Sequence, residues 1–152
     1  MKQAVTDGSG NESPAAIRHR TLTELRRTIQ RHPAVKIAYG DRDEDGRFRE
    51  VTVGFDPHRL GADSEDAGLR IKWRPRADPA EWAYFVFHYS ESTGRDFGWH
   101  REPNPHVDGL THFQEREHAD EDYLYGPASF DTDVPVELLW DVLGRIETKL
   151  KT

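Results

Sequence analysis

The chain has 152 residues, no cysteine and a formal net charge of −7 at pH 7. This length favours a single domain, and the lack of cysteine excludes disulfides, thiolate metal sites and a cysteine nucleophile. The negative charge argues against a generic nucleic-acid binder, because duplex binding depends largely on neutralisation of phosphates by Lys and Arg.

The balance of charged residues also reflects habitat. Acidic residues outnumber basic ones 28 to 21, and the basic set consists of 16 Arg and 5 Lys. An acid excess with scarce Lys suits a salt-loaded cytoplasm or a GC-rich genome, so local patches say more about partners than the total charge does. The N-terminus has no apolar segment of signal-peptide length, and no run is long enough to span a bilayer. We therefore expect a cytoplasmic protein.

The ordered part of the chain is predicted to begin at Thr21. Residues 1–20 mix Gly, Ser, Asn, Asp and Glu without periodicity, which is typical of a disordered tail. Thr21 and Glu24 have the spacing of a capping box, which predicts a helix that starts at Thr21 and ends before Pro33. Residues 21–152 then form one domain.

Alternation of apolar and polar residues predicts a series of strands after this helix. The expected strands are 35–39, 48–55, 69–74, 81–89, 95–101 and 112–118, and residues 123–133 show no clear pattern. Pro135 opens a last helix with a broad apolar stripe. Strands joined mainly by hairpins, with a helix at each end, predict a single α+β domain in which an antiparallel sheet is packed by an N-terminal and a C-terminal helix.

The strand at 81–89 is predicted to lie in the middle of the sheet. Its sequence places Tyr84 and Val86 on one face and Phe85 and Phe87 on the other. A strand that is apolar on both faces is expected to be covered from both sides.

Two charged segments have an ordinary interpretation and a functional one. Residues 41–46, DRDEDG, match the opening of a calcium loop, but the twelfth position holds Thr52 instead of the required Glu, so we predict a turn. The outward residues Arg70, Lys72 and Arg74, extended by Arg76, either contact phosphates or form the solvated face of an antiparallel sheet. The neighbouring aromatics are interpreted as core residues, with base stacking as the alternative.

Histidines form the strongest chemical pattern in the chain. His100, His106, His112 and His118 recur every six residues, a spacing that keeps strand residues on one face. If 95–101 pairs with 112–118 across a loop centred near His106, then His100 lies opposite His112 at a Cβ separation of about 5 Å. His88 is predicted to pair near Asp96, several residues from His100.

Three uses of this cluster are open. The histidines can form an acid–base pair, share a metal with His106 or Asp108 as third ligand, or serve as half-buried structural residues. We expect no metal and no cofactor, because no zinc signature is present and the loop with Pro103 and Pro105 has no evident second shell to orient ligands. The chain has no nucleophile elbow, P-loop, dinucleotide fingerprint or H-E-x-x-H helix.

The segments FGWHREPNPH at 97–106 and LTHF at 110–113 resemble TumE-like proteins, which are small prokaryotic toxins of toxin–antitoxin modules. That family similarly runs from an aromatic strand through an Arg- and Asn-bearing turn to a His-rich segment and a closing helix. The likeness covers roughly residues 82–150. The usual His doublet is here His106 followed by Val107, and an H-x-H is replaced by His112 alone. We interpret the hairpin at 35–55, with its acidic turn, as the mark of a separate halophile branch.

The resemblance implies a toxin-like protein that acts on RNA or translation and has a cognate antitoxin or small protein as its partner. A histidine pair exchanges protons near neutral pH, and Arg holds a phosphate bidentately. The predicted catalytic residues are His100, Arg101 and His112. The predicted ligand-binding residues are His106, Trp99 and Asn104.

A second function class is left open by the lack of a complete catalytic motif, namely a non-enzymatic binding or regulatory α+β domain. The distance between His100 and His112 discriminates between the two classes. A separation above about 10 Å excludes a shared proton or metal and favours the binding domain.

Overall fold

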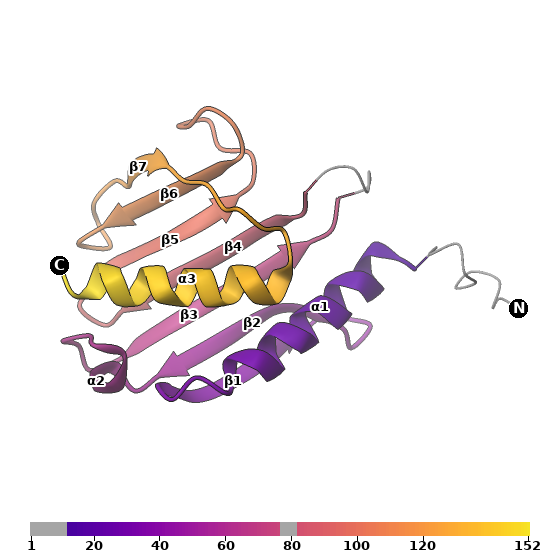
Figure 1. Ribbon diagram of the computed structural model, residues 1–152, viewed down its shortest axis with the longest axis horizontal. Coiled ribbons are helices and arrows are strands. Elements are labelled where there is room, and N and C mark those ends of the chain that lie inside the picture. The colour runs from indigo at the N-terminus through magenta and orange to yellow at the C-terminus, as the bar shows by residue number, and fades with distance from the viewer. Residues whose placement is uncertain (1–11, 77–81) are drawn as a thin grey trace, which may run out of the picture.

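The computed structural model describes residues 12–76 and 82–152 and shows one antiparallel sheet with helices (Figure 1). The helices are α1 (Pro14–Ile29), α2 (Pro57–Leu60) and α3 (Pro135–Leu150), and the strands are β1 (Val35–Arg42), β2 (Phe48–Phe55), β3 (Ala67–Arg74), β4 (Tyr84–Glu91), β5 (Asp96–Arg101), β6 (Thr111–Arg116) and β7 (Leu124–Pro127). The seven strands lie in sequence order across the sheet, and each pairs antiparallel with the next. The predicted α+β class is confirmed.

The first helix begins earlier than the sequence pattern predicts. Ser13 is its N-cap, with a side chain that accepts a hydrogen bond from the Ala16 amide, and Pro14 occupies the first turn. Proline at this position loses no helical hydrogen bond, so the helix starts at Ser13 and Pro14 and continues through the capping-box sequence at Thr21. The predicted start at Thr21 is wrong, and the part of the predicted tail in residues 1–11 lies outside the described residues.

Both long helices cover the same face of the sheet. In Figure 1, α1 and α3 cross in front of the strands, and their apolar sides join one core with the inward side chains of the sheet. Leu22, Leu25, Ile29, Leu138, Leu139, Leu143 and Ile146 pack there with Ile71, Phe85, Phe87, Tyr89 and Phe97. The expectation that β4 is covered from both sides is wrong: its other face carries Val86 and His88, which are buried although no helix within residues 12–76 and 82–152 covers them (Figure 1).

Two short elements lie in segments without a clear pattern. Strand β7 has only four residues, including a Gly and a Pro, and it pairs with β6 at the edge of the sheet. Helix α2 is a single turn inside the predicted loop at 56–68, capped by Asp56. Both elements are too short for hydrophobic periodicity to reveal them. Within residues 12–76 and 82–152, no helix combines the length and apolar character needed to cross a membrane.

The strand register aligns side chains in rows across the face that the helices leave open. Lys72 pairs with Val86, Val86 with His100, and His100 with His112. Next to this row, Arg70 pairs with His88. The basic residues of β3 and the histidines of β4, β5 and β6 therefore share one surface.

Candidate functional site

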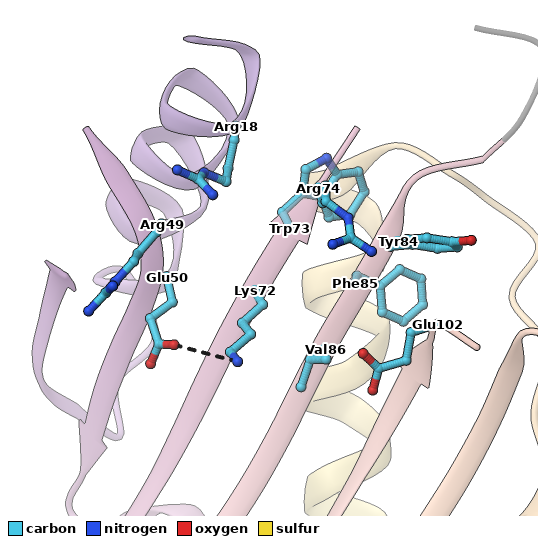
Figure 2. A pocket seen from close by; sticks show the side chains of 10 residues that line it. All are labelled: Arg18, Arg49, Glu50, Lys72, Trp73, Arg74, Tyr84, Phe85, Val86 and Glu102. Atoms are coloured by element: carbon cyan, nitrogen blue, oxygen red, sulfur yellow. Dashed lines mark ion pairs between the residues drawn. The ribbon is translucent and has the colours of Figure 1, made fainter. Parts of the chain in front are cut away.

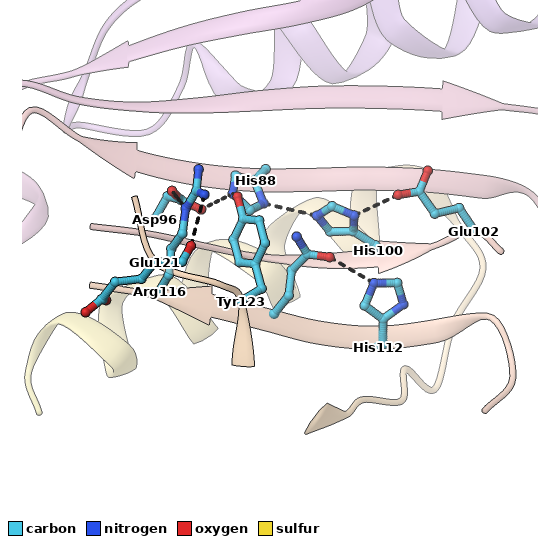
Figure 3. Close-up of polar contacts among 9 residues, drawn as sticks. His88, Asp96, His100, Glu102, His112, Arg116, Glu121 and Tyr123 are labelled. Atoms are coloured by element: carbon cyan, nitrogen blue, oxygen red, sulfur yellow. Dashed lines mark hydrogen bonds and ion pairs between the residues drawn. The ribbon is translucent and has the colours of Figure 1, made fainter. Parts of the chain in front are cut away.

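Three histidines line up on the open face of the sheet, one from each of the strands β4, β5 and β6 (Figure 3). The ring centroids of His88 and His100 are 5.2 Å apart, and those of His100 and His112 are 5.3 Å apart. His100 lies opposite His112, so the predicted register of this hairpin is confirmed. Their separation is well inside the limit of about 10 Å that a shared proton requires.

The prediction that His88 is remote from His100 is wrong. The β4–β5 hairpin is shifted by two residues from the expected register, so His88 lies opposite Gly98. A Cβ at Gly98 would clash with His88 Nδ1 and would lie only 2.6 Å from the Phe87 carbonyl oxygen. Because Gly98 has no side chain, the His88 ring leans across it and reaches His100.

A chain of hydrogen bonds joins the two histidines to two carboxylates. His88 Nε2 lies 2.7 Å from Asp96 Oδ1, and His88 Nδ1 lies 3.0 Å from His100 Nε2. His100 Nδ1 lies 2.9 Å from Glu102 Oε2. We call Asp96, His88, His100 and Glu102 the relay (Figure 3). The far end is fixed by Arg116, whose Nε donates to Asp96 Oδ2 at 2.8 Å.

The hydrogen bonds of the relay determine which nitrogen atoms carry protons. Ionised Asp96 only accepts, so His88 holds its proton on Nε2, and its Nδ1 accepts from His100 Nε2. A neutral His100 then has its lone pair on Nδ1, facing the Glu102 carboxylate. One further proton is needed to satisfy this last link. The relay is therefore built to take up a proton between His100 and Glu102.

Burial and hydrogen bonds set the charge of the relay. Burial lowers the pKa of His100 to about 4, although Glu102 opposes this effect. Burial likewise lowers the pKa of His88 against the influence of Asp96. Burial alone would raise the pKa of Asp96, but hydrogen bonds from Tyr123, Arg116 and His88 hold it below its usual range. At neutral pH the resting relay thus has neutral imidazoles and an ionised Asp96.

His112 belongs to the histidine row but not to the relay. Its Nε2 lies 3.1 Å from Gln114 Oε1, and its Nδ1 lies 3.3 Å from the Leu110 carbonyl oxygen. Its side chain is fully buried, and it contacts His100 through the ring alone. The geometry gives His112 a packing role beside His100.

Arg101 and Trp99 point to the other face of β5, because successive strand residues alternate in direction. Arg101 donates to Asp133 Oδ1 at 2.9 Å and to Thr111 Oγ1 at 3.1 Å, and it is almost fully buried. Trp99 packs against Phe113 at a centroid distance of 5.1 Å. The structure therefore does not bring Arg101 or Trp99 together with His100.

Asn104 and His106 lie in the loop between β5 and β6. Asn104 Oδ1 accepts a hydrogen bond from the His106 amide at 2.8 Å, which stabilises the turn. The exposed His106 ring stacks on Tyr125 at 4.9 Å, and Tyr125 contacts His112 at 6.0 Å. His106 is thus separated from His112 by one ring. In the described part of the chain, no three His, Asp or Glu side chains converge closely enough to hold a metal ion.

A basic groove of about 410 Å³ opens beside the relay, where β3 ends and β4 begins. Four basic and two acidic side chains line it, together with Tyr84 and Val86: Arg18, Arg49, Lys72, Arg74, Glu50 and Glu102. Figure 2 shows Glu102 next to Val86, with Lys72 and Arg49 across the groove. A local basic excess on a chain of net charge −7 attracts anions. Glu102 therefore connects the relay to an anion-attracting surface.

Sequence reasoning missed His88, Asp96 and Glu102 as site residues. A signal for Glu102 is present, because it follows His100 by two residues and so projects from the same side of the chain. His88 and Asp96 depend on the register of the β4–β5 hairpin, which the sequence does not fix to within two residues.

Comparisons with known proteins add no assignment. No protein-family model matches the chain, and neither curated proteins nor solved structures give a significant match. The resemblance to TumE-like toxins thus stays a prediction.

Proposed function

We propose that the protein cleaves RNA by general acid–base catalysis, with His100 and Glu102 together accepting the proton of a ribose 2′-hydroxyl. The observation that carries the proposal is the Nδ1 atom of His100, which the relay leaves unprotonated 2.9 Å from Glu102, a residue that lines the basic groove. A proton acceptor next to phosphate-binding cations is the combination that phosphodiester transfer requires.

RNA suits this site because it carries its own nucleophile. His100 and Glu102 take the 2′-hydroxyl proton, the 2′-oxygen bonds to the adjacent phosphorus, and the bond between phosphorus and the 5′-oxygen breaks. Water supplies a proton to the leaving 5′-oxygen. The products are a 2′,3′-cyclic phosphate and a 5′-hydroxyl. Lys72 and Arg74 line the groove and stabilise the negative charge that develops on the phosphate oxygens.

The relay stabilises the state that follows proton uptake. His100 then carries protons on both nitrogen atoms, donates to His88 and Glu102, and forms an ion pair with Glu102. His88 and Asp96 do not contact the substrate; they fix the tautomer that leaves His100 Nδ1 free to accept. They are positioning residues in the same sense as the carboxylate that orients a catalytic histidine.

The resemblance to TumE-like toxins supports an RNA substrate and adds a biological setting. We propose that expression of the chain arrests growth and that a cognate antitoxin relieves the arrest. His100→Ala should abolish the arrest at equal protein levels. Equal toxicity of the wild type and this variant would remove the toxin proposal.

The direct test measures cleavage of a labelled RNA oligonucleotide by purified wild type, His100→Ala and Glu102→Gln. We expect a loss of about 100-fold or more for His100→Ala, the usual contribution of general acid–base catalysis. Glu102→Gln is nearly isosteric and partly exposed, so it tests the site even where His100→Ala unfolds the protein. His58→Ala is the matched control, because His58 is exposed on α2.

The products separate this reaction from other cleavage. Mass spectrometry should find a 2′,3′-cyclic phosphate, and a substrate with one 2′-deoxyribose should resist cleavage at that position only. RNA that is bound but left intact by the wild type would support the alternative of a non-enzymatic binding domain. Cleavage that survives both site substitutions would overturn the proposal.

A further inference from the structure

The open face of the sheet bears an arrangement of charge and aromatic surface that the relay does not use. Arg70, Lys72 and Arg74 project from β3 as exposed side chains. On the side away from the relay, Tyr39 on β1 is 45% exposed and pairs with Thr52, which pairs with Arg70. An aromatic ring, a row of cations and the relay thus follow one another across the sheet.

We propose that this face binds single-stranded nucleic acid, with phosphates on Lys72 and Arg74 and a base on Tyr39. This inference rests on the proposed function and names the substrate form that the same site takes. Single-stranded nucleic acid is recognised by basic grooves and aromatic platforms, and open sheet faces provide both. Every base has a ring face, so such binding tolerates many sequences.

The distribution of charge favours a single strand over a duplex. The face presents only a few cations, whereas the chain as a whole has a net charge of −7. A duplex has two phosphate backbones, and the few cations of this face neutralise only part of their charge. The remaining phosphates are repelled by the acidic residues on the rest of the protein surface. A single strand can follow the groove alone.

The groove is arranged in advance for phosphate. The Arg74 guanidinium lies 4.9 Å from the centroid of the Tyr84 ring, a cation–π contact that restricts its position. Lys72 Nζ is 3.9 Å from Glu50, and a long, partly exposed pair of this kind contributes little stability. Lys72 is in register with Val86, which is in register with His100, so the backbones of Lys72 and His100 lie two strands apart, about 10 Å. The long Lys72 side chain and Glu102 line the same groove between them.

The test uses single-stranded DNA, because it lacks the 2′-hydroxyl and cannot undergo the proposed cleavage. Fluorescence anisotropy with a short labelled DNA strand should show saturable binding to the full chain. Lys72→Ala and Arg74→Ala should each weaken binding about 5- to 10-fold, and each should reduce the slope of log K against log salt by about 0.7, the value for one phosphate contact on a single strand. Tyr39→Ala should weaken binding about 5-fold or more without changing that slope.

Matched controls keep the result specific. Arg59→Ala removes an exposed Arg from α2, before the start of β3, and should leave the affinity unchanged. A duplex of the same sequence should bind at least 10-fold more weakly. Unfolded variants are recognised by circular dichroism before binding is measured.

The outcomes distinguish this inference from the proposed function. Binding that depends on Lys72, Arg74 and Tyr39, without any RNA cleavage, supports the inference and overturns the proposed function. RNA cleavage by the wild type, with DNA binding that is absent or equal in Arg74→Ala and Arg59→Ala, overturns the inference alone. Duplex binding as tight as single-strand binding also overturns it.

Discussion

Strand β5 carries two ionisable side chains in successive residues, His100 and Arg101, and its two faces use them differently. On the helix-covered face, Arg101 pairs with Asp133 at 2.9 Å beneath aromatic rings. On the open face, His100 joins His88 and Glu102 in the relay. Both arrangements are largely buried and hydrogen-bonded, yet only the second contains imidazole rings, which can take up or release a proton.

The difference separates a charged pair that only affects stability from a group of side chains that can take part in proton transfer. Arg101 stays protonated in proteins, so its pair with Asp133 has one state and can only stabilise or destabilise the fold. Burial raises the pKa of Asp133, and Arg101 opposes that effect. The relay has two states that differ by one proton. The following predictions test this division, beginning with the largest expected effect.

Asp133→Asn should lower the free energy of unfolding by about 3 kcal/mol, because it leaves the charge of Arg101, which is almost fully buried, uncompensated. Urea denaturation near neutral pH measures the change. Arg101→Met is the matched variant and should cost less, because the Asp133 charge that it leaves without a partner is 33% exposed. The folded fraction of Arg101→Met should cleave RNA as the wild type does. Lost cleavage at unchanged stability would instead return Arg101 to the catalytic set that the sequence predicts.

The sequence predicts the fold well because its main signals are local. Alternation at Leu69, Ile71 and Trp73 and the helical stripe after Pro135 each depend on a few neighbouring residues. The pairing of His100 with His112 was also predictable, because the two strands of a hairpin pair symmetrically about the centre of the loop between them, here near His106. These local signals do not determine the β4–β5 register, which depends on the turn geometry after Glu91.

The candidate site was harder to predict, because its contacts depend on the strand register and on the room beside each side chain as well as on the spacing of residues in the sequence. A two-residue shift keeps His88 on the same face, so the hydrophobic pattern cannot detect the error. The missing side chain of Gly98 then lets His88 lean toward His100, and no pattern in the neighbouring sequence indicates this contact. Arg101 was misplaced for a simpler reason: it adjoins His100 in sequence, and adjacent strand residues face opposite ways.

Gly98→Ala should disturb the open face alone and lower the free energy of unfolding by about 2 kcal/mol, the usual range for overpacking. The new Cβ would lie 2.9 Å from His88 Cα and 2.6 Å from the Phe87 carbonyl oxygen, so backbone as well as the ring must move. RNA cleavage should fall with stability, because His88 no longer holds the tautomer of His100. Gly126→Ala in β7 is the control, since a Cβ there meets no atom within 4 Å. Equal effects of the two substitutions would contradict the role given to Gly98.

The pH dependence of stability should come from the open face. The pKa of His100 is about 4 in the folded protein and near 6.5 when unfolded, so its contribution is complete above about pH 6.5 and is lost as the pH falls toward 4. Wild type should therefore lose about 1–2 kcal/mol more than His100→Gln between about pH 7 and pH 5. Asp96 has a lowered pKa and loses its contribution only below this window. Parallel stability curves for the two proteins would show that His100 is not held neutral by burial.

His106→Ala should have the smallest effect, and it tests whether the loop between β5 and β6 belongs to the site. The exposed ring stacks on Tyr125 at the edge of the sheet, and loss of one such contact costs about 0.5 kcal/mol. Cleavage of RNA should be unchanged, because His106 reaches His112 only through Tyr125 and does not touch the relay. Kinetics over a range of RNA concentrations separate the possible roles. An increase in KM at constant kcat would make His106 a ligand-binding residue, as the sequence predicts, and would extend the RNA surface from the groove to β7. Unchanged values of both constants would confine the site to the relay and the groove.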